Sequence, residues 1–217
     1  MSFDVHPEMR PLIEARAKLP VAKTRDEDRA NWSAYSRANN VPPPNDMTVE
    51  NRTVEARDGH PIKIRIYTPA GGGRRAGLVY MHGGGFVKGD CDTSDTTGWG
   101  LAEGTGAVVV SVDYRLAPEN PYPIPFNDCI DVLNDIFERP DAYGVDASRL
   151  GVVGDSAGGN LAAATALWAR DNDGPALKVQ GLIYPCLTDR LEATAYDRNA
   201  EAPGLTTASM ESYWVAY

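Results

Sequence analysis

The chain has 217 residues, enough for one domain with a sizeable hydrophobic core. Its formal net charge of −9 argues against nucleic acid and anionic membranes as partners. No signal-peptide pattern opens the sequence, and no apolar run reaches the roughly 20 residues of a membrane span. Cys91, Cys129 and Cys186 are far apart and odd in number, which favours free thiols over a disulfide framework. We therefore expect a cytoplasmic protein without a membrane span.

Two helices are expected ahead of the first strand. Within residues 6–19, apolar side chains recur near helical spacing, which predicts a short amphipathic helix. Thr24 and Glu27 form a capping box, in which each side chain satisfies a free N–H group of the first turn. A second helix is therefore expected over residues 25–38, and the prolines at 42–44 end it. The sequence leaves open whether these helices pack on the core or form part of a lid.

Alternating side chains predict strands over residues 52–56 and 62–68, joined by a hairpin turn in which His60 is expected to be exposed and without function. From residue 76 onward, strands and helices alternate, which predicts a mostly parallel sheet with helices on both faces. Further strands are expected over 76–81, 107–114, 149–153 and 179–184, and helices over 94–103, 126–138 and 160–170. The fold class predicted from this pattern is α/β.

Residues 154–158 (GDSAG) fit the Gly-x-Ser-x-Gly pattern of a nucleophile elbow, and they lie between an expected strand and an expected helix. Such a turn exposes the hydroxyl of Ser156, and a side chain at Gly154 or Gly158 would collide with the neighbouring element. The N–H of Ala157, at the start of the helix, can bind a developing oxyanion. The motif predicts that Ser156 is a catalytic nucleophile.

A second glycine motif, HGGGF at residues 82–86, follows the strand expected over 76–81. It matches the loop that supplies oxyanion donors in lipases and esterases. Two chance glycine turns are the alternative interpretation, which the order of the motifs and their strands disfavours. A phosphate-binding loop is also disfavoured, because the sequence has neither the P-loop nor the dinucleotide pattern.

Together with DYRLAPE at residues 113–119, these motifs resemble the hormone-sensitive-lipase-like (GDXG) branch of the α/β-hydrolases, and the resemblance covers essentially the whole chain. It implies an α/β-hydrolase fold and a serine carboxylesterase that acts on short- to medium-chain acyl esters without a metal or organic cofactor. It also implies an N-terminal helical cap region at 1–45, a hydrolase core at 46–186 and a second cap segment at 187–217.

The resemblance also assigns roles to individual residues of the two glycine motifs. Ser156 matches the nucleophile, and four residues match the oxyanion hole: Gly83, Gly84, Gly85 and Ala157. Among these, Gly83 shapes the loop, while His82 and Asp155 orient it. His82 does not match the general base of the family.

A serine nucleophile needs a histidine base and an orienting carboxylate, which in α/β-hydrolases follow the serine in the chain. Here His6, His60 and His82 all precede Ser156. We therefore expect a core that is incomplete after its sixth strand, with the Asp and His of the triad beyond this sequence. The 217 residues alone are expected to be inactive.

The last residues predict a helix that continues to the end of the sequence. Met210, Tyr213, Trp214 and Tyr217 share one helical face, and neither glycine nor proline follows them. A different class of function stays open, namely a non-catalytic, receptor-like protein that binds a small molecule and lacks the base. These residues do not separate an esterase from an amidase or a thioesterase, and the oligomeric state, a homo-oligomer included, is also left open.

Overall fold

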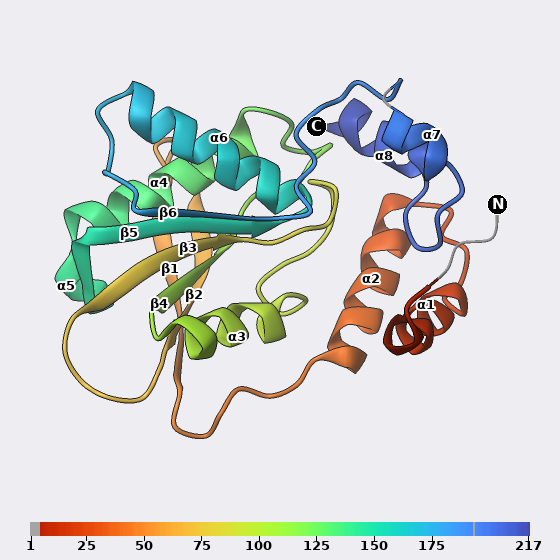
Figure 1. Cartoon of the computed structure of the whole chain (residues 1–217). Helices are drawn as coiled ribbons and strands as arrows, with labels where there is room; N and C mark the ends of the chain where they lie inside the picture. The colour runs from red at the N-terminus through yellow and green to blue at the C-terminus, as the bar shows by residue number, and fades with distance from the viewer. Residues whose placement is uncertain (1–4, 193) are drawn as a thin grey trace.

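The computed structural model describes residues 5–192 and 194–217. A six-stranded sheet of order β1-β2-β4-β3-β5-β6 forms its centre, with helices packed on both faces (Figure 1). The strands are β1 Thr48–Glu55, β2 Pro61–Thr68, β3 Arg75–Met81, β4 Val108–Asp113, β5 Val145–Asp155 and β6 Val179–Ile183. The α/β class and the helices on both faces, which the sequence predicted, are confirmed.

The sheet is parallel from β4 to β6 and antiparallel at the β1–β2 edge. The hairpin of β1 and β2 pairs antiparallel with β4, whereas β4, β3, β5 and β6 run parallel to one another. In the β3–β5 pair, Met81 lies opposite Gly154. The loop after β3 and the turn after β5 therefore leave the sheet side by side at its carboxyl edge.

The helices form three groups around the sheet (Figure 1). Helices α4 and α6 cover one face of the sheet and α3 covers the other, while α1, α2, α7 and α8 lie beyond its carboxyl edge. The helices are η1 Pro7–Met9, α1 Arg10–Ala17, α2 Arg25–Asn39, α3 Asp95–Thr105, α4 Ile124–Glu138, α5 Pro140–Tyr143, α6 Ala157–Asp171, α7 Thr194–Arg198 and α8 Thr207–Ala216. None of the helices within 5–192 and 194–217 is long and apolar enough to span a bilayer.

Strand β4 is buried on both of its faces, which explains its almost unbroken run of apolar residues. Val108, Val110 and Val112 belong to the core cluster beneath α4 and α6, whereas Val109 belongs to the cluster on the α3 side. Successive residues of a strand point to opposite faces, so a strand that is covered on both faces is apolar at every position.

Two elements next to Ser156 are longer in the structure than the sequence predicted. Strand β5 begins at Val145 rather than at residue 149, and α6 begins at Ala157 rather than at 160. Gly158 and Gly159, which have a poor helix propensity, are helical here because both are buried in the packing of α6. The short helices α5 and α7 were not predicted, since a single turn carries little periodic signal.

The predicted capping box is present at the start of α2, with one change of partner. The N–H of Glu27 donates to Thr24 Oγ1 at 3.2 Å, as expected. The Glu27 carboxylate accepts from the N–H of Lys23 at 2.6 Å rather than from that of Thr24. Both side chains still satisfy backbone donors at the helix start, which fixes where α2 begins.

Candidate active site

Ser156 lies at the sharp turn between β5 and α6, with φ 54° and ψ −118°. A positive φ is strained for a serine and persists because the surroundings fix the backbone. The N–H of Ser156 donates to the carbonyl of Ile183 in β6 at 2.9 Å, and its carbonyl accepts from the N–H of Asn160 at 3.1 Å. The neighbouring strand and the following helix therefore both hold the serine in place.

The glycines on either side of Ser156 are required by close packing of the backbone. A Cβ atom at Gly154 would overlap the carbonyl of Gly158, and one at Gly158 would overlap the carbonyl of Met81 at the end of β3. No side-chain movement could relieve a collision with backbone. The turn therefore brings α6 against β3 at a distance that only glycine allows.

The loop that follows β3, residues 82–89, curves beside this turn. Gly84 and Gly85 have φ of 130° and 62°, which favour glycine. The N–H of Gly83, which was expected in the oxyanion hole, donates to Asp155 Oδ1 at 3.0 Å and is therefore occupied. For the N–H groups of Gly84, Gly85 and Ala157, no hydrogen bond is recorded to any residue that the structure describes.

Asp155 connects the glycine loop to the elbow. Its Oδ1 accepts from the Gly83 N–H and from the Tyr80 hydroxyl, the latter at 2.8 Å. Burial and the nearby Asp155 charge raise the pKa of Tyr80 well above its ordinary value, so the phenol stays protonated and donates. These contacts support the loop-orienting role expected of Asp155.

His82 is held inside the protein by the same loop. Its side chain stacks on Tyr114, with ring centroids 4.3 Å apart, and the residue is 1% exposed. Its Nδ1 lies 2.8 Å from the Gly83 carbonyl, which assigns the ring proton to Nδ1. A Cβ atom at Gly89 would lie 2.5 Å from His82 Nδ1, so the ring packs closely against a residue that has to be glycine. This packing supports the expectation that His82 orients the loop and is not the base.

The other two histidines lie away from Ser156. His60 immediately precedes β2, and β4 and β3 separate β2 from β5, so about 14 Å of strand spacing lies between them. The side chain of His6 is 69% exposed and lies beside Glu8, ahead of α1. Within 5–192 and 194–217, no histidine has a recorded contact with Ser156.

The DYRLAPE motif, residues 113–119, supports the glycine loop. The N–H of Ala117 donates to the carbonyl of Phe86 at 2.9 Å. Arg115 fixes this segment, because its guanidinium and its backbone N–H both donate to the fully buried carboxylate of Asp128. In the sequence, this motif was notable only for its resemblance to the family. In the structure, it holds the glycine loop in place through the bond between Ala117 and Phe86.

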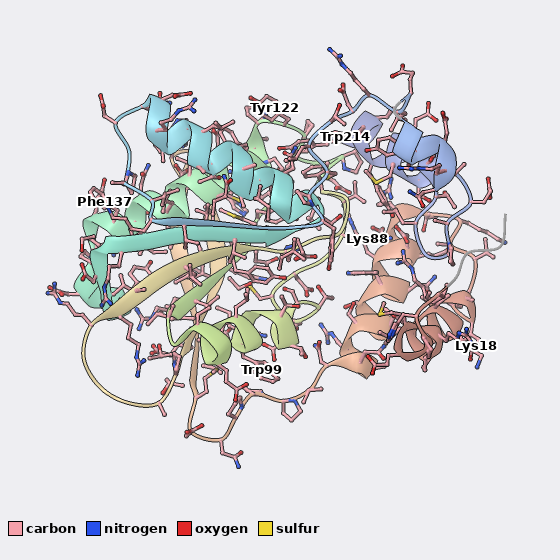
Figure 2. All side chains as sticks on the ribbon, in the orientation of Figure 1. Lys18, Lys88, Trp99, Tyr122, Phe137 and Trp214 are labelled. Atoms are coloured by element: carbon pink, nitrogen blue, oxygen red, sulfur yellow. The ribbon has the colours of Figure 1, made fainter. Side chains whose placement is uncertain are left out.

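Helix α8 lies directly on the glycine loop. The Phe86 ring stacks on Tyr217 with centroids 3.7 Å apart and is tilted against Trp214 at 5.5 Å. A Cβ atom at Gly85 would lie 2.5 Å from the Tyr213 ring. The face predicted from the spacing of these aromatic residues therefore packs against the candidate oxyanion donors, and Trp214 lies between α8 and the core in Figure 2.

Cys186 contacts the turn that holds Ser156. Burial raises the pKa of Cys186 to about 11, so this cysteine, whose N–H donates to the Ser156 carbonyl, carries a neutral thiol. Among the described residues, no group of three or more His, Cys, Asp or Glu side chains is placed to hold a metal ion. Ser156 stays the candidate nucleophile predicted from the sequence.

A strained serine at a strand–helix turn, next to N–H groups without a recorded partner among the described residues, has the geometry expected of a nucleophile elbow in an α/β-hydrolase. A family model described as alpha/beta hydrolase fold matches residues 78–217. The chain belongs to this family, and its resemblance to the hormone-sensitive-lipase-like branch is confirmed.

Individual relatives are esterases and a deacetylase. The structure is similar to that of a hyperthermophilic esterase from the archaeon Pyrobaculum calidifontis, with a TM-score of 0.88 and 36% identity over 99% of this chain and 71% of that one. Carboxylesterase NlhH of Mycobacterium tuberculosis is 36% identical over 99% of this chain and 67% of its own length. Arylacetamide deacetylase of Oryctolagus cuniculus is 42% identical over 82% of this chain and 46% of its own length.

Proposed function

We propose that the protein is a carboxylic ester hydrolase that uses Ser156 as its nucleophile. One observation carries this proposal: the strained Ser156 precedes Ala157 at a turn that leaves the sheet next to the glycine loop, and the N–H groups of Ala157, Gly84 and Gly85 have no recorded partner among the described residues. Donors in this arrangement are suited to the negative charge that develops on the carbonyl oxygen during acyl transfer.

In the proposed reaction, Ser156 Oγ attacks the acyl carbonyl and its proton passes to a general base. The tetrahedral oxyanion binds the N–H groups of Ala157, Gly84 and Gly85, and the alcohol leaves with the proton from the base. Water then hydrolyses the acyl-enzyme by the reverse sequence of proton transfers. Because Asp155 occupies the N–H of Gly83, we assign this residue to shaping the loop rather than to binding the oxyanion.

The general base and its carboxylate partner are not assigned to any residue of this sequence. His82 is fixed by Tyr114 and Gly83, and His60 and His6 lie elsewhere. We therefore place the triad His and Asp outside residues 1–217 and expect these residues alone to be inactive. The chain spans 67% of carboxylesterase NlhH and 71% of the Pyrobaculum calidifontis esterase.

The proposed substrates are short- to medium-chain acyl esters, hydrolysed without a cofactor. Relatives named carboxylesterase NlhH and, from Pseudomonas putida, ethyl acetate hydrolase support this class; the latter is 35% identical over 78% of this chain and 54% of its own length. The segments 1–45 and 187–217 are proposed to cover the substrate, because their helices α1, α2, α7 and α8 lie beyond the carboxyl edge of the sheet (Figure 1).

Amide deacetylation is a second candidate reaction for the same site. The 42% identity to arylacetamide deacetylase favours it. The oxyanion donors would act on the same type of tetrahedral intermediate, but an amine leaving group needs a proton from the general acid. Matched ester and anilide substrates with the same acyl group separate the two reactions.

The test uses the protein with any residues that follow Tyr217 in its gene. A fluorophosphonate probe should label the peptide that contains Ser156, and Ser156→Ala should lose both the label and about 10⁶-fold in kcat on p-nitrophenyl acetate. Ser148→Ala, in the same strand but exposed and bound to Asp146, should keep both. Labelling that survives Ser156→Ala would contradict the assignment. Saturable binding of an ester without turnover would instead favour the receptor-like alternative.

A further inference from the structure

Helix α2 contacts the backbone of the glycine loop through Arg29. Its Nε donates to the carbonyl of Val87 at 2.7 Å, and its Nη2 donates to the carbonyl of Ala117 at 3.0 Å. Both Nη atoms also donate to the Glu119 carboxylate, at 2.9 and 2.6 Å. One planar guanidinium therefore joins α2 to the glycine loop and to the segment that supports it, a geometry that lysine does not reproduce.

Charge keeps this contact in place at neutral pH. The hydrogen bond from Arg29 lowers the pKa of Glu119, so Glu119 is ionised well below neutrality. The same bond raises the pKa of Arg29. The side chain of Arg29 is 25% exposed and that of Glu119 is 56% exposed, so solvent partly screens this pair, and the bonds from Arg29 to the two backbone carbonyls complete the contact.

Lys88, next in the chain after Val87, makes the second contact with α2. Its side chain is 6% exposed, and its Nζ donates to both carboxylate oxygens of Asp28, at 2.9 and 3.0 Å. The same ammonium lies 5.4 Å from the ring centroid of Trp32 in α2 and 5.5 Å from that of Tyr213 in α8. In Figure 2, Lys88 lies between the sheet and α2. A buried ammonium is costly unless it is paired, so Asp28 and the two rings fix its position.

These contacts reach the oxyanion donors through one tight turn. The carbonyl of Gly84 accepts from the N–H groups of both Val87 and Lys88, each at 3.2 Å. A Cβ atom at Gly84 would overlap the Lys88 carbonyl. Because residues 84–88 form one closed turn, a displacement of Val87 or Lys88 changes the direction of the Gly84 and Gly85 peptide groups.

We propose that Arg29 and the Asp28–Lys88 pair are positioning residues that set the geometry of the oxyanion hole from α2. The inference rests on the proposed function and adds that the N-terminal helical segment governs turnover as well as covering the site. A donor displaced by about 1 Å can cost about 100-fold in rate, so removal of one of these contacts is expected to lower kcat.

The experiment compares Arg29→Gln and Lys88→Met with a matched control, Arg37→Gln. Arg37 lies on the same helix and also joins it to the core, through Asp92 at 2.9 Å, but it has no recorded contact with the glycine loop. The measurements are kcat and KM for a p-nitrophenyl ester, the affinity for a trifluoromethyl ketone that forms a tetrahedral adduct with Ser156, and the melting temperature. The protein includes any residues beyond Tyr217 in its gene.

Arg29→Gln and Lys88→Met are each expected to lower kcat and the affinity for the ketone about 10- to 100-fold, with KM changed less than about threefold. Arg37→Gln is expected to keep the parental kcat and ketone affinity even where it lowers the melting temperature. A purely structural role would lower the melting temperature alone.

If a folded Arg29→Gln or Lys88→Met variant kept the parental kcat and ketone affinity, the inference would be wrong. Should Arg29→Gln fail to fold, Lys88→Met carries the test, and failure of both to fold would assign these contacts to stability alone. The parent and Ser156→Ala are measured first. A parent without Ser156-dependent turnover refutes the proposed function, whereas an active parent with fully active variants refutes only this inference.

Discussion

The two loops that flank Ser156 are held in opposite ways. The elbow is fixed from within, because β6 and α6 bind its backbone and the Gly158 backbone lies against β3. The glycine loop at 82–89 is fixed from outside, through α2, α8 and the 113–119 segment. The elbow therefore depends on the core of the fold, while the loop depends on helices beyond the sheet.

Because of this difference, we expect substitutions in the elbow to affect mainly stability and substitutions in the glycine loop to affect mainly turnover. A side chain added at Gly154 or Gly158 would collide with backbone atoms of the core, so its main effect should be a lower free energy of unfolding. A substitution in the glycine loop displaces the proposed oxyanion donors, so we expect its main effect to be a lower kcat.

The largest effect is expected from Gly158→Ala. Its Cβ would overlap the backbone carbonyl of Met81, which cannot move without displacing β3, so we expect a loss of about 4–5 kcal/mol of stability or more. Urea unfolding followed by circular dichroism measures it. Gly104→Ala in α3 is the control, because no atom lies within 4 Å of the added carbon and the change should gain about 0.5–1 kcal/mol. A normally stable Gly158→Ala variant would show that the elbow is not fixed by the core.

Gly85→Ala should act mainly on turnover. The added carbon would lie 2.5 Å from the Tyr213 ring, and φ at this position is 62°, so the N–H is expected to shift. Loss of one oxyanion donor costs about 10²–10³ in kcat, with KM nearly unchanged. Adding Tyr213→Ala should restore part of kcat by making room for the methyl group. Steady-state kinetics would contradict the oxyanion role if KM rose while kcat stayed normal.

A smaller effect is expected from Tyr80→Phe, which removes the hydroxyl bound to Asp155. Stability should fall by about 1.5 kcal/mol, and kcat should fall less than tenfold because the Gly83 N–H still binds Asp155. Tyr67→Phe is the matched control, since this buried hydroxyl lies on the same face of the sheet but binds Asp95 of α3, at 2.8 Å, instead of Asp155. It should lose similar stability and keep kcat. Equal kcat values in the two variants would show that Asp155 does not orient the loop.

The sequence predicted the elements that carry their signal locally. The elbow is a pattern of five consecutive residues, and its strand and helix are recognisable from their sequences, so the turn at Ser156 and the succession of strands and helices along the chain could be predicted. The order of the strands within the sheet was not predicted. The aromatic face of α8 was also predicted from its spacing, although the surface that it covers was not. The parallel strands, being buried on both faces, were evident as unbroken apolar runs.

The contacts that hold the glycine loop could not be predicted in this way. Arg29 and Asp28 lie on the charged surface of a helix, where most such residues contact only water. Lys88 lies just after the glycine motif, and its partner Asp28 lies 60 residues earlier in the chain. No sequence pattern relates two residues at such a separation. Likewise, only the structure shows that Asp155 occupies the Gly83 N–H, because this contact depends on the β3–β5 register.

The central claim is that the N–H groups of Ala157, Gly84 and Gly85 receive the oxyanion formed at Ser156. A crystal structure of the protein with a phosphonate bound to Ser156 Oγ tests it most directly. The phosphonyl oxygen should lie about 2.7–3.1 Å from these three nitrogen atoms, with the Gly83 N–H still bound to Asp155. An oxygen directed away from both loops, or bound to Gly83 with Asp155 displaced, would contradict the account.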